Sequence, residues 1–460
     1  MWRRYPWLVV GTGVYLGLRL WSFVGIAGHA SSFTDTSEYE RVERMSVFSL
    51  DFWTWYKPWG SALLWKVLPG ATSTSAPVGQ EIISVAAWLF LAFVMFRTLE
   101  RRAVKYVGFS LVLAFSLVPA IAVWDGALLS ESLSVSLGAL LVGTMLLVAE
   151  SPSWPRVAAL LVAAFLLANT RSSNGYLTPF LLIPLAVAAA WRASAGRRAR
   201  WPAVAVAVGS LAIAGFTQVS VNVRQWEVSF GEIVAGRILH SPSATAYFIA
   251  HGMPYRPSLE QQLWNAEHRL PNTYYMERYE TDPTLTWFFP WFNARFRSVY
   301  AGYLLSHPSQ ALVDPMRDLP SLVSASPSTH DLQGLPVGIY AAQGYRDALP
   351  GWLARVLYPS SWRLLLALSV AVLVLLLGLA VNGIGRRVWL VPAIMLLSTL
   401  PHAAIIWDGS ATSLGRHALL LAIYVRLGLI LASVYVVDGF LEHGSRVRPN
   451  TSAESADERT

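Results

Sequence analysis

Runs of apolar residues recur along almost the whole chain of 460 residues. About ten of them reach roughly 20 residues, the length that an α-helix needs to cross the hydrocarbon core of a bilayer. Hydrophobic residues make up 54% of the chain and the mean hydropathy is +0.45, which excludes an ordinary soluble domain. The pattern predicts an all-α polytopic membrane protein. The predicted spans are approximately 6–27, 78–98, 104–123, 128–149, 156–170, 175–191, 202–221, 362–383, 388–406 and 418–438.

Basic residues gather at the ends of the chain and on alternate connections between these spans. The clusters are Arg3–Arg4, Arg97–Lys105, Arg156, Arg192–Arg200, Arg386–Arg387 and Arg446–Arg448. If the spans alternate in direction, all of these clusters fall on one face, which the positive-inside rule makes cytoplasmic. We therefore expect a multi-pass protein of the inner (plasma) membrane with both termini in the cytoplasm. The formal net charge of +8 comes from Arg residues at the ends of apolar runs, where they act as topology signals. The positive charge therefore does not indicate a nucleic-acid partner, and none is expected.

Two long segments then fall on the outer face. In the first, the stretch "LDFWTWYKPWGSALLWKVLPG" is rich in Trp and Tyr and predicts helices that lie at the membrane interface. The second is too long for a simple connection and predicts a small extracytoplasmic domain of mixed or helical structure. The predicted organisation is a transmembrane module at 1–221 with an outer loop at 28–77, the outer domain at 222–361, transmembrane helices at 362–440 and a disordered cytoplasmic tail at 441–460.

Polar residues that topology does not explain gather on the predicted outer face. Ionisable groups at membrane depth are costly, so they usually pair or serve a function. The segment "SSFTDTSEYERVERM" begins this set and is unusually acidic for a chain with 13% charged residues. We expect these residues to share one membrane boundary. The candidates are Asp35, Glu38, Lys57, Asp125, Glu131, Arg171, Asn174, Asp408, Arg416 and His417, with Arg19 inside the first span as a neighbour of Glu131 or of a bound phosphate.

Carboxylates beside cations at the outer surface suit glycosyl transfer from a lipid-phosphate sugar. A carboxylate can take the proton of the acceptor hydroxyl as a general base. Arg, Lys or protonated His can stabilise the leaving phosphate. Attack by the acceptor in a single displacement would invert the anomeric carbon. The chain has no Cys, which excludes thiolate chemistry, and the reaction requires no cofactor, although a divalent cation held by Asp35 and Glu131 is an alternative.

Several short motifs, taken in order, resemble the GT-C superfamily of integral membrane glycosyltransferases. "FTDTSEYE" places Asp35 where that family has its catalytic Asp, and "DFWTWYKPWGSALLW" looks like the interfacial helices of its first outer loop. "LLSESLSVSLGALLV", "NTRSSNG" and "SLGRHALL" resemble later motifs, although Ser172 stands where Pro is common. The resemblance implies a polyprenyl-phosphate sugar as donor and a cell-envelope glycan or lipid as acceptor. The Arg-, Ala- and Trp-rich composition looks actinobacterial, which favours mannose or arabinose.

Other interpretations remain open at this stage. Asp35 also fits a helix N-cap, Glu131 an ion pair and Arg171 a contact with headgroups. A lipid-linked glycan polymerase or ligase would act on the same side, with essential Arg or His residues in a large outer loop. A lipid or glycolipid transporter would place its polar residues near mid-membrane and often in repeated halves, and no such halves are evident. The predicted catalytic carboxylates are Asp35 as the general base, Glu38 as its neighbour and Glu131 as the alternative base.

Overall fold

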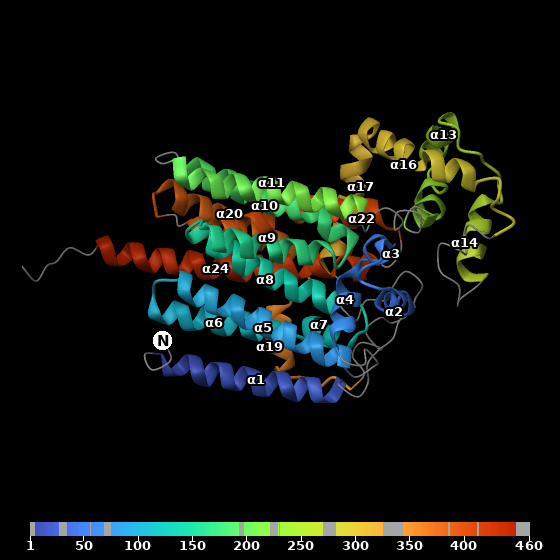
Figure 1. Cartoon of the computed structure of the whole chain (residues 1–460). Helices are drawn as coiled ribbons and strands as arrows, with labels where there is room; N and C mark the ends of the chain where they lie inside the picture. Colours follow the sequence, from blue (N-terminus) through green and yellow to red (C-terminus); the bar gives the residue numbers. More distant parts are fainter. Residues whose placement is uncertain are drawn as a thin grey trace, which may run out of the picture.

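The computed structural model describes residues 5–26, 35–55, 57–68, 75–192, 197–220, 229, 231–269, 282–324, 344–384, 387–411 and 414–447. Within these ranges all regular secondary structure is helical, as the sequence predicts. The long helices run side by side in one bundle, and a group of shorter helices projects from one end of it (Figure 1).

Eight helices in the described part of the chain are long and apolar enough to cross a membrane, which supports a multi-pass membrane protein. They are α1 (Pro6–Ile26), α5 (Ser75–Thr98), α8 (Glu131–Glu150), α10 (Ser172–Arg192), α11 (Arg197–Val219), α20 (Trp362–Val381), the consecutive pair α21 (Leu390–Leu397) and α22 (Thr399–Gly409), and α24 (Leu419–Val447). Helices α8 and α24 are the most buried of the set and form the centre of the bundle, whereas α1 and α20 lie at its rim.

The predicted spans 104–123 and 156–170 are not among these eight helices. In the first, α6 (Arg102–Ser116) breaks before α7 (Pro119–Ala122) and η2 (Val123–Gly126), and the two parts meet at 58°. Pro119 explains the break, because proline cannot donate the hydrogen bond that would continue α6. In the second, α9 (Trp154–Ala168) has 15 residues and is about 22 Å long, shorter than a bilayer core of about 30 Å.

The described residues of the predicted outer loop at 28–77 form three short helices. They are α2 (Thr36–Arg44), α3 (Leu50–Thr54) and α4 (Trp59–Val67), and they cover the end of the bundle opposite the start of α1 and the end of α24 (Figure 1). The remaining short elements are η3 (Val234–Ile238), α13 (Pro242–Ala250), α14 (Leu259–Arg269), α16 (Phe289–Ser306), α17 (Pro308–Val323), α19 (Gly351–Leu357), η4 (Arg387–Trp389) and α23 (Leu414–His417).

The predicted outer domain at 222–361 divides into two parts. Residues between Ile233 and Tyr303 have a hydrophobic core of their own, built largely from aromatic rings. Residues of α17 and α19, such as Leu322 and Leu357, belong instead to the main core of the bundle. At the C-terminus, α24 continues to Val447, beyond the predicted start of the tail at 441, and residues 448–460 lie outside the described part of the chain.

Arg426 lies inside α24 and fixes two of these segments to the bundle. Its side chain is 1% exposed, and its guanidinium donates to the carbonyl oxygens of Val323 (2.8 Å) and Pro359 (2.6 Å). The guanidinium also stacks over the ring of Tyr358 at 3.8 Å. Because each carbonyl lies in a different segment, one side chain ties the end of α17 and the entry to α20 to the central helix.

We expect Arg426→Met to lower the stability of the purified protein by about 2 kcal/mol or more, because buried carbonyl groups lose a charged donor. Arg426→Lys is expected to recover only part of the lost stability, since an ammonium group cannot donate to both carbonyl oxygens in the geometry of the planar guanidinium. Thermal unfolding in detergent measures the effect, with the exposed Arg363→Met as the matched control. Equal melting temperatures for Arg426→Met and the wild type would contradict this role.

Candidate active site

Five charged side chains from five separate parts of the chain meet at the end of the bundle that α2–α4 cover. We call them the charge cluster: Asp35, Lys57, Glu131, Arg171 and Arg416. The two carboxylate oxygens of Asp35 accept separately from Lys57 Nζ (2.8 Å) and from Arg416 Nη2 (2.5 Å). Glu131 Oε1 lies 3.1 Å from Arg171 Nη1 and 3.3 Å from Arg416 Nε. Arg416 therefore bridges the two carboxylates.

The helices of the first loop bring Asp35 and Lys57 to this position. Asp35 precedes α2, and its backbone carbonyl accepts from the N–H groups of the first turn. Next to it, Thr36 donates from Oγ1 to the carbonyl of Leu128 at 2.8 Å, which fixes α2 to the segment before α8. On the other side, the N–H of Gly60 in α4 donates to Asn169 O at 3.0 Å. A Cβ at position 60 would lie 2.7 Å from that oxygen, so the close approach requires glycine.

Glu131 is the first residue of α8 and is almost completely buried, with 2% of its surface exposed. A carboxylate is favourable there because backbone N–H groups leave a partial positive charge at a helix N-terminus. Its Oε1 serves both arginines, whereas its Oε2 is buried without a hydrogen-bond partner. An unsatisfied buried oxygen is costly, which makes this atom a candidate contact for a ligand group.

Asn174 holds the turn that carries Arg171. Its side-chain Nδ2 donates to Ser134 Oγ (3.1 Å) and to Thr170 Oγ1 (3.0 Å), and Asn174 is 1% exposed. The turn between α9 and α10 is thereby tied to α8, one helical turn after Glu131. Asn174, which the sequence predicts to bind substrate, thus stabilises the turn before Arg171 through Ser134 and Thr170.

The charges of the cluster determine the protonation of Asp35. Burial alone would raise the pKa of Asp35, but Lys57 and then Arg416 outweigh it and hold the pKa well below its usual range. Burial would likewise lower the pKa of Lys57, yet Asp35 keeps it above its ordinary value. Counted by residue type, the three cations and two carboxylates of the cluster have a formal charge of +1.

His417 and Glu38 flank the cluster. Burial, followed by repulsion from Arg171 and Arg416, lowers the pKa of His417, so its imidazole is neutral at physiological pH. A neutral ring can accept or donate one hydrogen bond but adds no positive charge. Glu38 lies one turn after Asp35 on α2 and is also buried.

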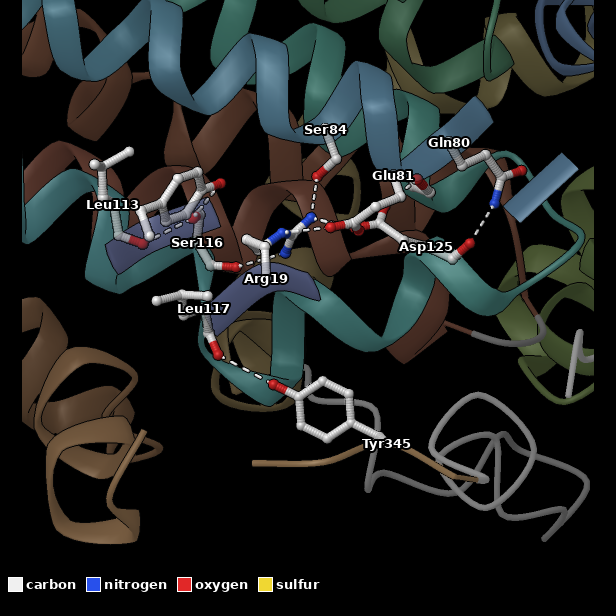
Figure 2. A network of polar contacts seen from close by, with 11 residues as sticks. Arg19, Gln80, Glu81, Ser84, Leu113, Ser116, Leu117, Asp125 and Tyr345 are labelled. Atoms are coloured by element: carbon white, nitrogen blue, oxygen red, sulfur yellow. Dashed lines mark hydrogen bonds and ion pairs between the residues drawn. The ribbon is translucent and has the colours of Figure 1, made fainter. Parts of the chain in front are cut away.

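A second polar network lies beside the cluster, inside the bundle, around Arg19 of α1 (Figure 2). Arg19 Nη2 lies 2.9 Å from Glu81 Oε2 and 2.6 Å from Asp125 Oδ2. The other oxygen of Asp125 accepts from Ser132, the residue that follows Glu131. The expectation that Arg19 neutralises Glu131 is therefore wrong, because its charge is taken up by Glu81 and Asp125. Asp125, predicted to bind substrate, is 2% exposed and is engaged within this network.

The same network satisfies the backbone of the broken span. Arg19 Nη1 donates to Ser116 O at 3.2 Å, and Tyr345 donates to Leu117 O at 3.1 Å (Figure 2). Further along, Gln80 Nε2 donates to the carbonyls of Asp125 (3.0 Å) and Ala127 (2.9 Å). Carbonyl groups freed at a helix break must find such partners where water is excluded. The segment leading to Glu131 is therefore fixed at several points.

Asp408 is the predicted site residue whose contacts lie elsewhere. Its backbone carbonyl accepts from Tyr300 at 3.0 Å, and its neighbour Trp407 lies under the guanidinium of Arg237 at 3.7 Å. Arg237 also donates to Ser410 O at 2.6 Å. These contacts join the aromatic-rich helices between Ile233 and Tyr303 to the end of α22, so Asp408 belongs to that junction.

Sequence reasoning did not single out Glu81 or Arg426, although both are ionisable residues inside apolar runs, which is the signal that could have identified them. Within the described ranges, no group of three or more His, Cys, Asp or Glu side chains is arranged to hold a metal ion. No protein-family model matches the chain, and a search of curated proteins returned no match.

The depressed pKa of Asp35 predicts how its ion pairs respond to pH. A carboxylate with a lowered pKa contributes stability above its unfolded pKa and loses it only as pH falls through the folded value. We expect the difference in melting temperature between wild type and Asp35→Asn to stay constant from about pH 8 to about pH 5 and to narrow only below about pH 4. Closure of this difference above pH 5 would show that Asp35 is not held by Lys57 and Arg416.

Arg19 offers a test of the second network. Arg19→Met leaves two buried carboxylates without a counter-ion, for which we expect a loss of about 3–5 kcal/mol. The triple variant Arg19→Met, Glu81→Gln and Asp125→Asn removes all three charges and is expected to be more stable than the single variant. Thermal unfolding in detergent compares them, and a triple variant that is no more stable would argue against this charge pairing.

Proposed function

We propose that this protein is a membrane glycosyltransferase that moves a sugar from a polyprenyl-phosphate donor to a hydroxyl group of a cell-envelope glycan or lipid. The observation that carries the proposal is the Asp35 carboxylate held between Lys57 and Arg416 at one end of the bundle. A potential base and two phosphate-binding cations are thereby within one hydrogen bond of each other. The GT-C-like order of the motifs supports the same reading, with the site on the extracytoplasmic face and both termini in the cytoplasm.

The reaction is a single displacement. The acceptor oxygen forms a bond to the anomeric carbon while the bond from that carbon to the phosphate oxygen breaks, which inverts the configuration. The electron pair leaves with the lipid phosphate, and the acceptor proton passes to Asp35. Arg416 and Lys57 stabilise the charge that develops on the phosphate.

Donor binding also prepares the base. In the free protein Lys57 and Arg416 keep the pKa of Asp35 low, and a carboxylate with so low a pKa is a weak base. A phosphate that draws these cations toward itself removes the interactions that lower this pKa. Asp35 thus becomes a stronger base only when the donor is in place. It then takes the proton of the acceptor hydroxyl when the sugar is ready to be transferred, and not in the absence of a donor.

The formal charges balance throughout this reaction. The cluster at +1 becomes neutral when a phosphodiester with one negative charge binds. After transfer, Asp35 is neutral and the lipid phosphate carries one further negative charge, so the total is again zero. A donor linked through a diphosphate, as a glycan polymerase or ligase would use, brings one more negative charge and leaves the site at −1. The balance favours a monophosphate donor, with mannose or arabinose as the first sugars to test.

We expect Asp35→Asn to lower the rate of sugar transfer by about 10²–10⁴-fold, the usual contribution of a general base. The assay incubates the purified full-length protein with polyprenyl-phosphate mannose or arabinose and a glycan acceptor, and follows the released lipid phosphate. Asp51→Asn is the matched control, because Asp51 lies exposed in the same loop. Full activity of Asp35→Asn would rule out Asp35 as the base.

A further inference from the structure

Glu131 and Asp35 use their carboxylate oxygens differently. Asp35 uses both oxygens for cations that a phosphate can also bind, whereas Glu131 uses one oxygen for Arg171 and Arg416 together. Glu131 is 2% exposed against 13% for the Asp35 side chain, so an acceptor hydroxyl reaches it less easily. The reaction proposed above therefore passes the acceptor proton to Asp35 and does not use Glu131 as the base.

Keeping the negative charge of Glu131 is costly, which indicates that the charge itself is used. Burial of a carboxylate carries a large desolvation penalty that ion pairs offset only in part. Glutamine has nearly the same shape and would offer the same carbonyl oxygen to Arg171. A carboxylate with one oxygen lacking a hydrogen-bond partner is thus an expensive way to hold two arginines.

The charge of Glu131 determines the formal charge of the whole cluster. With Glu131 ionised, three cations face two carboxylates and the formal charge is +1. Without it, the same three cations face Asp35 alone and the formal charge is +2. A cluster at +1 is neutralised by an anion with one charge, and a cluster at +2 by an anion with two.

We infer that Glu131 determines donor specificity: its fixed charge makes the cluster select lipids linked through one phosphate and disfavour those linked through two. This inference rests on the proposed function, because it takes the charge cluster as the donor-phosphate site. It assigns Glu131 a task different from that of the base. Arg171 contributes to the same selection of donors, since it shares Oε1 of Glu131 with Arg416.

The test measures binding without turnover, with two soluble probes. Dodecyl methyl phosphate is a phosphodiester with one negative charge, and dodecyl methyl diphosphate carries two. Calorimetric titration of the purified full-length protein in detergent gives the ratio of the two Kd values. We expect Glu131→Gln to shift this ratio toward the diphosphate by on the order of tenfold, because one nearby charge is removed. Glu131→Asp retains the charge and should shift the ratio less than Glu131→Gln does. Glu40→Gln removes the charge of an acid paired on the surface with Arg44 and should leave the ratio unchanged.

A second variant keeps the inference testable if Glu131→Gln does not fold. Arg171→Gln lowers the cluster to a formal charge of zero and should shift the ratio further toward the monophosphate. An unchanged ratio in both Glu131→Gln and Arg171→Gln overturns the inference and leaves the transfer function intact. A wild-type protein that binds neither probe, together with unimpaired transfer by Asp35→Asn, would instead overturn the proposed function.

Discussion

A charge buried in an apolar helix bundle has to be neutralised within the protein, and this constraint organises the end of the molecule that carries the site. Arg416 meets two carboxylates from segments hundreds of residues away in the chain, and Arg19 meets two others. Neither arginine could remain in place if its partners moved, because the cost of an unpaired buried ion is several kcal/mol. The ion pairs therefore define how the first loop, α8 and the last connection come together.

The same rule applies to backbone groups. The break between α6 and α7 exposes carbonyl oxygens, and side chains from α1, α5 and the segment before α19 supply their donors. A broken helix that is satisfied in this way is rigid, and its last residues lead directly to Glu131. A local departure from regular helix thus serves to place one carboxylate.

The sequence predicts the fold class and most of the spans because hydrophobic length is a strong signal. It also predicts the residues that meet in the charge cluster, since Asp35, Glu131 and Arg416 all fall at the same predicted boundary. It cannot predict which cation meets which carboxylate, because that choice depends on helix packing. Asp125 pairs with Arg19 inside the bundle, and Asp408 lies at the junction with the helices between Ile233 and Tyr303, although both follow Trp and precede Gly. The span predicted at 156–170 corresponds to the short α9, because the polar residues Asn169 and Arg171 mark the turn that ends this helix and begins the next.

The length of α9 has a consequence for the lipid around it. One side of this helix is open to its surroundings, with Val162 59% exposed, and the helix is shorter than a bilayer core of about 30 Å. Hydrocarbon chains cannot leave the mismatch empty, so the membrane beside α9 thins and the headgroups move inward. At one end of α9 stands Arg171, which contacts Glu131 of the charge cluster. Under the function proposed above, such a dip would bring the phosphate of a lipid donor level with the cations while its tail stays in the bilayer.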